Sequence, residues 1–75
     1  MSVQKRFGLA IRRRRLQQGV SQEELAYRAG LHRTYVSDIE RGVRNPSLVN
    51  VEKLAEALGT SLSDLFAETE SGGSG

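Results

Sequence analysis

Four glycines divide this 75-residue chain into short segments, and their spacing restricts the chain to short helices. Each follows a stretch with apolar residues every three or four positions, where the end of a helix favours a left-handed residue. They are Gly19, Gly30, Gly42 and Gly59. Serines suited to cap the next helix stand shortly after three of them, at Ser21, Ser47 and Ser61. The pattern predicts five helices, over residues 3–18, 22–29, 33–41, 48–58 and 62–67, and no sheet.

The composition limits what such a bundle can be. A chain this short buries little surface and has no cysteine for a disulfide, so helix packing and self-association must stabilise it. With His32 as the only histidine and no cysteine, we expect no metal site and no cofactor. The sequence shows no nucleophile–base pair, so nothing in it indicates an enzyme. No apolar run is long enough for a membrane span or resembles a signal peptide, so we expect a soluble, cytoplasmic protein without membrane contact.

The net charge of +2 conceals a strong asymmetry. Residues 1–46 carry ten lysines and arginines against four acidic residues, a net charge of +6. Residues 47–75 carry one lysine against five acidic residues, a net charge of −4. The first part of the chain should therefore attract a polyanion such as nucleic acid, and the second part should repel it.

The second and third predicted helices are joined by a very short connection that contains Gly30. A glycine at positive φ permits a sharp reversal there, which is typical of a helix-turn-helix. In the helix that follows, Val36 and Ile39 fall on the inner face, while Arg33 and Thr34 fall on the outer face. His32 stands at the cap position of this helix, where we expect it to act as a cap or to lie near a phosphate. The outer face carries donors suited to base edges or phosphates.

Several motifs together resemble the Cro/cI-type (Xre-like) helix-turn-helix family. They are Ser21-Gln-Glu-Glu-Leu-Ala26, Gly30, Tyr35-Val-Ser-Asp-Ile-Glu40 with Arg41-Gly42, Asn45-Pro46, Leu54-Ala55 and Ala57-Leu58-Gly59. Within that family, the chain is similar to small stand-alone regulators such as restriction-modification controller proteins. The resemblance implies an all-α, five-helix, lambda-repressor-like domain over residues 1–67, with the helix-turn-helix at about 22–41. It also implies a transcriptional regulator that binds double-stranded DNA as a homodimer.

The resemblance further implies which residues contact DNA. They are Gln22, Arg33, Thr34, Tyr35, Ser37, Asp38, Arg41, Arg44 and Asn45. Gln22 would bind a phosphate, and Arg33 would read guanine through O6 and N7. Tyr35 would contact a phosphate or a thymine methyl group, or else only pack against the second helix. Asp38 would accept from a cytosine amino group or form a structural pair with Arg33 or Arg41.

The run Arg12-Arg-Arg-Arg15 does not form one basic patch, because successive side chains on a helix point about 100° apart. We expect Arg12 and Arg13 to face solvent, with Arg12 near a phosphate. Arg14 should lay its stem over apolar surface and extend its guanidinium into solvent. The resemblance implies that Arg15 forms a structural ion pair with Glu40, which stands beside Ile39 in an apolar stretch.

The end of the chain leaves two interpretations of its apolar residues. Leu62, Leu65 and Phe66 form a dimer interface in the interpretation that the family favours, or close the core of the monomer in the simpler one. Residues 68–75 are rich in glycine and serine, which predicts a flexible tail, either a linker or a cloning scar.

Three functions are compatible with these features. The leading one is a sequence-specific regulator that binds a palindromic operator, with the helix at 33–41 in the major groove. The second is an antitoxin that binds a toxin and represses its own operon, and the third is a basic domain that binds DNA nonspecifically. The sequence identifies no second protein partner.

Overall fold

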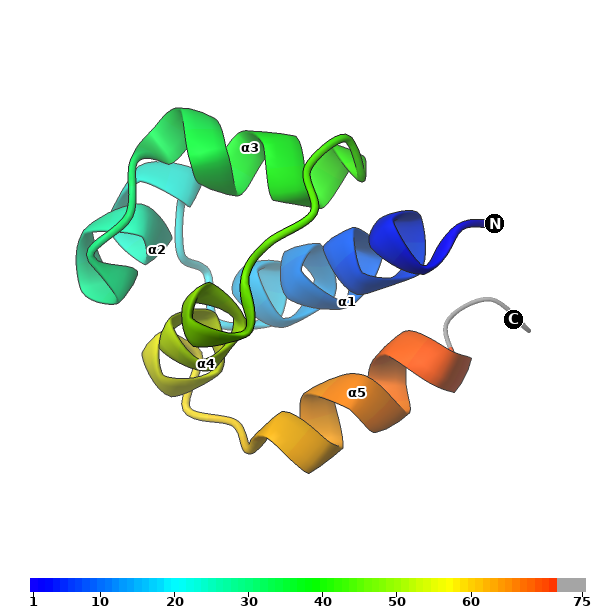
Figure 1. The fold of residues 1–75 in the computed structure, drawn as a ribbon. Coiled ribbons are helices and arrows are strands. Elements are labelled where there is room, and N and C mark those ends of the chain that lie inside the picture. The colour runs from blue at the N-terminus through cyan, green and yellow to red at the C-terminus, as the bar shows by residue number, and fades with distance from the viewer. Residues whose placement is uncertain (72–75) are drawn as a thin grey trace.

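A computed structural model describes residues 1–71, and this part of the chain consists of five helices without a strand (Figure 1). The helices are α1 (Val3–Gln17), α2 (Gln22–Ala29), α3 (Arg33–Arg41), α4 (Leu48–Ala57) and α5 (Leu62–Ser71). The predicted all-α, five-helix architecture is confirmed, and the predicted bounds of the first four helices agree to within one residue. None of these helices is long and apolar enough to cross a bilayer.

The serine caps and glycine stops act where the sequence places them. The Oγ atoms of Ser21, Ser47 and Ser61 accept the backbone N–H three residues later, at 3.0, 3.2 and 3.0 Å. Gly30 and Gly42 end α2 and α3 with φ values of +70° and +76°, which other residues adopt only with strain. These local signals therefore fix where α2, α3 and α4 begin or end.

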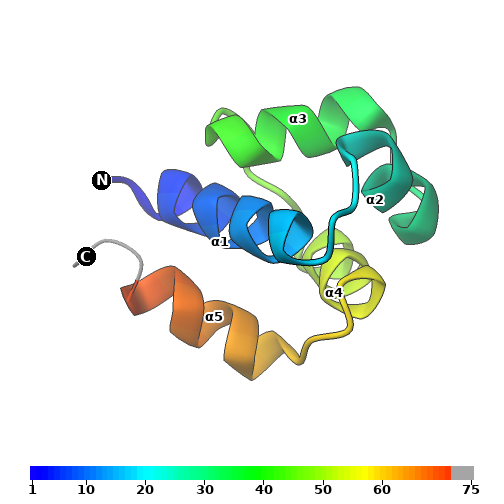
Figure 2. The same cartoon turned by 180° about the vertical axis from the view of Figure 1, so that it is seen from behind.

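Helix α1 lies between α3 and α5, and α4 contacts both α2 and α5 (Figures 1 and 2). The largest fully buried side chains come from all five helices: Ile11, Leu25, Val36, Ile39, Leu54 and Leu65. One core thus supports α3 from behind and leaves its other face open.

Gly8, in the middle of α1, allows an unusually close approach between α1 and α3. A Cβ atom at this position would collide with the carbonyl oxygen of Ile39 and lie 2.8 Å from that of Glu40. An isolated glycine in a helical pattern has no local signature of a tertiary contact, so the sequence alone does not distinguish Gly8 from other glycines.

Helix α5 continues to Ser71, four residues beyond its predicted end, so the predicted tail starts too early. Thr69 is buried, and its Oγ1 donates to the carbonyl oxygen of Leu65 at 2.8 Å. Glu68 forms an ion pair with α1. The ion pair with α1 and the burial of Thr69 hold a segment that composition alone classes as a linker. The remaining predicted tail, residues 72–75, lies outside the described residues.

Candidate nucleic-acid interface

The turn between α2 and α3 sets the direction of α3. The N–H of Gly30 donates to the carbonyl oxygen of Tyr27 at 3.2 Å, and that of Leu31 donates to Ala26 at 2.8 Å. Beyond the turn, Val36 and Ile39 are fully buried and anchor α3 to the core. The arrangement is a helix-turn-helix with the outer face of α3 open to solvent (Figure 1).

The N-terminal end of α3 presents exposed polar side chains. Arg33 and Thr34 are exposed, and Ser37, one turn on, is half-buried. The Arg33 guanidinium has no hydrogen bond or ion pair with another residue of 1–71, so its donors are available to a ligand. His32 occupies the N-cap position, but its side chain makes no capping hydrogen bond. No group of acidic or histidine side chains within residues 1–71 is arranged to hold a metal ion.

Asp38 pairs with Arg41, on the same helix. Nη2 of Arg41 lies 2.5 Å from Oδ1 of Asp38. Of the alternatives left open by the sequence, the structure thus contains the pair with Arg41 and not a pair with Arg33. This ion pair offsets the charge of an acid that would otherwise repel a polyanion, and it leaves Arg33 unengaged.

A buried ion pair ties α1 to α3. Nε of Arg15 lies 2.6 Å from Oε2 of Glu40, and Nη2 lies 3.0 Å from Oε1, so the contact is bidentate. The two side chains are only 11% and 4% exposed. Arg15 also donates to the carbonyl oxygen of Val20 at 2.9 Å. The hydrogen bond that Arg15 donates to Glu40 raises the pKa of Arg15, against the opposing effect of burial, so the guanidinium stays charged.

The same carboxylate holds Gln22 at the start of α2. Nε2 of Gln22 donates to Oε1 of Glu40 at 3.1 Å. An amide nitrogen carries two N–H groups, so one remains for the phosphate contact that the resemblance implies. Glu40 therefore fixes a residue expected to bind DNA as well as the helix that carries Arg33.

A cluster of Tyr35, Arg44 and Asn50 lies beside the start of α3. Nδ2 of Asn50 donates to the Tyr35 hydroxyl at 3.0 Å, and Cζ of Arg44 lies 4.7 Å from the centroid of the Tyr35 ring. Asn50 was not among the residues predicted to contribute to the site. It lies 15 residues from Tyr35, across a turn with Pro46, and no sequence pattern links the two positions.

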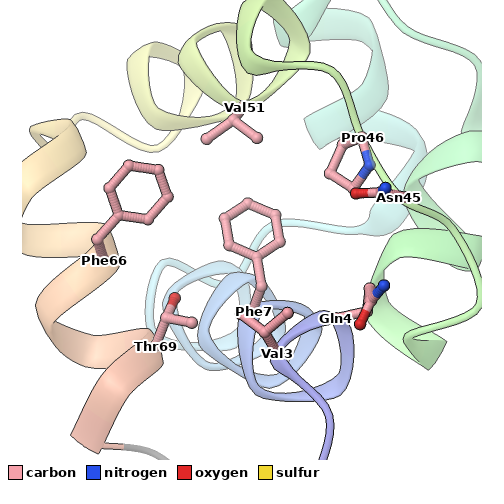
Figure 3. A pocket seen from close by; sticks show the side chains of 8 residues that line it. All are labelled: Val3, Gln4, Phe7, Asn45, Pro46, Val51, Phe66 and Thr69. Carbon is pink, nitrogen blue, oxygen red and sulfur yellow. The ribbon is translucent and has the colours of Figure 1, made fainter.

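Asn45 lies with Pro46 at the edge of a pocket that is separate from the outer face of α3. Figure 3 shows its apolar lining, to which α1 contributes Phe7, α4 contributes Val51 and α5 contributes Phe66. The side chain of Asn45 is exposed and has no hydrogen-bond partner within residues 1–71.

The three residues predicted at a dimer interface have different environments. Leu65 is fully buried in the monomer, so its assignment to an interface is wrong, and it closes the core as the simpler interpretation holds. Leu62 packs against the core and is half-buried. Phe66 remains 39% exposed and is the one large apolar side chain of the three that is available to a partner.

Arg14 does not extend into solvent, and this prediction is wrong. Its Nε lies 2.7 Å from Oε1 of Glu68 on α5, and Nη1 of Arg13 lies 3.6 Å from the other carboxylate oxygen. The error follows from the tail prediction, because an unstructured residue 68 offers no fixed partner. Arg12 is exposed as expected.

Comparisons of the sequence and of the fold with known proteins both find helix-turn-helix regulators. The sequence pattern of the helix-turn-helix family matches residues 11–65. Control protein C.BamHI of Bacillus amyloliquefaciens is 52% identical over 67 residues, which cover 88% of this chain and 83% of that protein. The crystal structure of the restriction-modification controller C.AhdI from Aeromonas hydrophila is 49% identical, with a TM-score of 0.82 over 84% of this chain and 96% of that chain. The controller C.Esp1396I, solved as a tetramer with its natural 35 base-pair operator, is 32% identical, with a TM-score of 0.88 over 96% of this chain and 95% of that chain.

Proposed function

Because the chain belongs to the helix-turn-helix family, we propose that it is a sequence-specific, DNA-binding transcriptional regulator that binds a palindromic operator as a homodimer. The observation that carries this proposal is the open face of α3. Val36 and Ile39 anchor the helix, while Arg33 and Thr34 stand exposed at the end that would enter the major groove. An arginine at such a position matches the O6 and N7 acceptors of guanine.

The comparisons favour this function over the alternatives. C.Esp1396I was solved on operator DNA, and C.BamHI is a control protein, so an operator-binding regulator has support among relatives that an antitoxin lacks. The protein acts by binding, without catalysis, and works in the cytoplasm where its DNA lies. In a dimer on one face of DNA, the two α3 helices stand about 34 Å apart, one helical turn.

The proposal is tested by selecting bound sites from random DNA at physiological salt. We expect an enriched palindrome whose two half-sites have a fixed separation. Enrichment of one palindrome supports both specificity and dimeric binding, whereas recovery of unselected DNA contradicts the proposal.

Replacing Arg33 by alanine should relax specificity at one base position. We expect a loss of about 1–3 kcal/mol per half-site on the selected operator, with discrimination lost at that position. Fluorescence anisotropy with a set of single-base operator variants measures both effects. Lys53→Ala is the matched control, because it removes one positive charge from an exposed position on α4. An equal loss on every sequence, with a changed salt slope, would instead indicate nonspecific binding.

Replacing Phe66 by aspartate should weaken the proposed dimer. The ring of Phe66 is partly exposed in the monomer, and an aspartate in its place would bury a negative charge in the proposed interface. We therefore expect a loss of about 2 kcal/mol or more in dimerisation free energy. Analytical ultracentrifugation measures the dissociation constant, and thermal denaturation reports on the monomer fold. Tyr27→Asp is the control, because Tyr27 is 82% exposed on α2. A Phe66 variant that dimerises like the unchanged protein would exclude this face of α5.

A further inference from the structure

We propose that Asn50, on α4 and outside the helix-turn-helix, is a positioning residue for DNA binding. It commits the Tyr35 hydroxyl to donate a hydrogen bond outward, so that Tyr35 and Arg44 together clamp one phosphate of the DNA backbone. The inference rests on the proposed function. It adds a residue to the interface and specifies the chemistry that Tyr35 recognises.

The hydrogen bond between Asn50 and Tyr35 has a defined direction. Nδ2 of Asn50 donates to Oη of Tyr35 at 3.0 Å. A phenolic hydroxyl has one proton to donate and also accepts, so the bond from Asn50 occupies its accepting side. No acceptor within residues 1–71 takes the hydroxyl proton. Tyr35 is therefore left as a donor, and accepting a bond from Asn50 polarises its O–H further.

Asn50 is itself held in place at the start of α4. Its backbone N–H donates to Oγ of Ser47, the N-cap of α4, at 3.2 Å. Its side chain is half-buried in the first turn of α4, whose next turn is fixed by the buried Val51 and Leu54. The amide donor thus stands on a rigid helix, and the Tyr35 hydroxyl takes its direction from the core.

A positive charge lies beside the Tyr35 hydroxyl. The guanidinium of Arg44 lies over the Tyr35 ring, with Cζ 4.7 Å from the ring centroid, which is the geometry of a cation–π contact. Arg44 is exposed and has no ion pair with an acidic side chain within residues 1–71. The Tyr35 ring therefore holds the Arg44 guanidinium near the hydroxyl and leaves the N–H groups of Arg44 free.

Together these groups select for an anion. Tyr35 and Arg44 line a hollow that also opens onto His32, where α3 starts without a side-chain cap. The hollow offers a neutral donor from Tyr35 and a charged donor from Arg44 beside the uncapped start of α3, and the Asn50 amide keeps a second N–H besides the one donated to Tyr35. A phosphate carries a negative charge and several acceptor oxygens, so it matches this set better than a base edge or a thymine methyl group.

A double-mutant cycle on the selected operator tests the role of Asn50. We expect Tyr35→Phe to weaken binding at least about 10-fold, since it removes one hydrogen bond to a charged group. Asn50→Ala should weaken binding about 3-fold, and the double variant should bind like Tyr35→Phe alone, because Asn50 acts through the hydroxyl. Tyr35→Phe keeps the ring that supports Arg44, so it leaves the fold intact. Thermal denaturation checks this for each variant.

Asn50→Asp provides the sharper variant. A carboxylate cannot donate, so it would accept the Tyr35 proton and remove the outward donor. We expect weaker binding than for Asn50→Ala, beyond what an added negative charge causes. Val49→Asp is the matched charge control, because Val49 is 62% exposed next to Asn50. In the Tyr35→Phe background, the two aspartate variants should weaken binding by the same factor.

The salt dependence separates the two arms of the clamp. Arg44→Gln removes one charged phosphate contact, so it should reduce the slope of log K against log salt by about 1. Tyr35→Phe removes no charge and should leave the slope unchanged. Unchanged affinity for Asn50→Ala, or additive losses in the double variant, would overturn the inference. In that case, normal binding of the unchanged protein and the expected loss for Arg33→Ala would show that the proposed function still holds. Failure of the unchanged protein to select any operator would overturn both.

Discussion

Replacing Glu40 by alanine is expected to destabilise the fold by about 3–5 kcal/mol, a large part of the stability of a small domain. The Arg15 guanidinium would lose its bidentate partner while its side chain is only 11% exposed, so a nearly buried charge would remain without compensation. Gln22 would lose its acceptor at the same time. Urea denaturation followed by circular dichroism measures the free energy of unfolding.

A second ion pair provides the control for this experiment. Glu24 and Arg28 form a pair on α2 with side chains that are 47% and 45% exposed, so Glu24→Ala should cost less than about 1 kcal/mol. Equal losses for the two variants would contradict the structural role of the buried pair. Replacing both partners, as Arg15→Met with Glu40→Leu, should recover much of the loss. The recovery should be incomplete, because the carbonyl oxygen of Val20 loses its donor.

The raised pKa of Arg15 sets the pH range of its contribution. A group whose pKa is higher in the folded state stabilises the fold at every pH below its unfolded value and loses that effect only as the pH rises through the folded value. For an arginine, both values lie beyond the alkaline end of ordinary measurements. The loss caused by Arg15→Met should therefore not depend on arginine titration across the neutral range, as urea denaturation at several pH values would show.

Replacing Gly8 by alanine is expected to cost about 3 kcal/mol, at the upper end for overpacking in a core. The added methyl group would collide with the carbonyl oxygen of Ile39 and approach that of Glu40, and backbone atoms cannot rotate aside as side chains do. Alanine favours a helix over glycine by about 1 kcal/mol, which offsets only part of this cost. Because α3 would be displaced from α1, operator affinity should fall together with stability.

Gly19→Ala tests whether this effect is steric. Gly19 has a φ of +68° and open space around it, so alanine there should cost only about 1–2 kcal/mol of backbone strain. Thermal denaturation of both variants compares the two costs. A Gly8→Ala protein as stable as the unchanged one would mean that α1 and α3 can separate without loss.

The helix boundaries were predictable from the sequence because their causes are local. Ser21 caps a backbone N–H three residues away, and Gly30 adopts a positive φ whatever the distant chain does. The end of α5 has a different origin. Glu68 is held by its ion pair with α1, and Thr69 is held by burial. Neither interaction can be recognised from a local sequence that is rich in glycine and serine.

The site was predictable to a similar extent. The exposure of Arg33 follows from the apolar residues on the opposite face of α3, which periodicity shows directly. The partner of Asp38 could not be predicted from the sequence, because Arg33 and Arg41 both lie on the same helix. Asn50 joins the site only through the path of the turn between α3 and α4, so no periodic pattern connects it with Tyr35.

Arg14 and Arg15 are neighbours in α1, yet one pairs with Glu68 on α5 and the other with Glu40 on α3. Two adjacent charges thereby connect α1 to the helix carrying Arg33 and to the helix proposed to join two copies. In such a dimer, tilting one of these helices would strain the attachment of the other. One extra base pair between half-sites turns the second half-site by about 35° around the DNA axis. A protein connected in this way should therefore bind operators with altered spacers weakly. Its specificity then depends on the distance between the half-sites as well as on their base sequence.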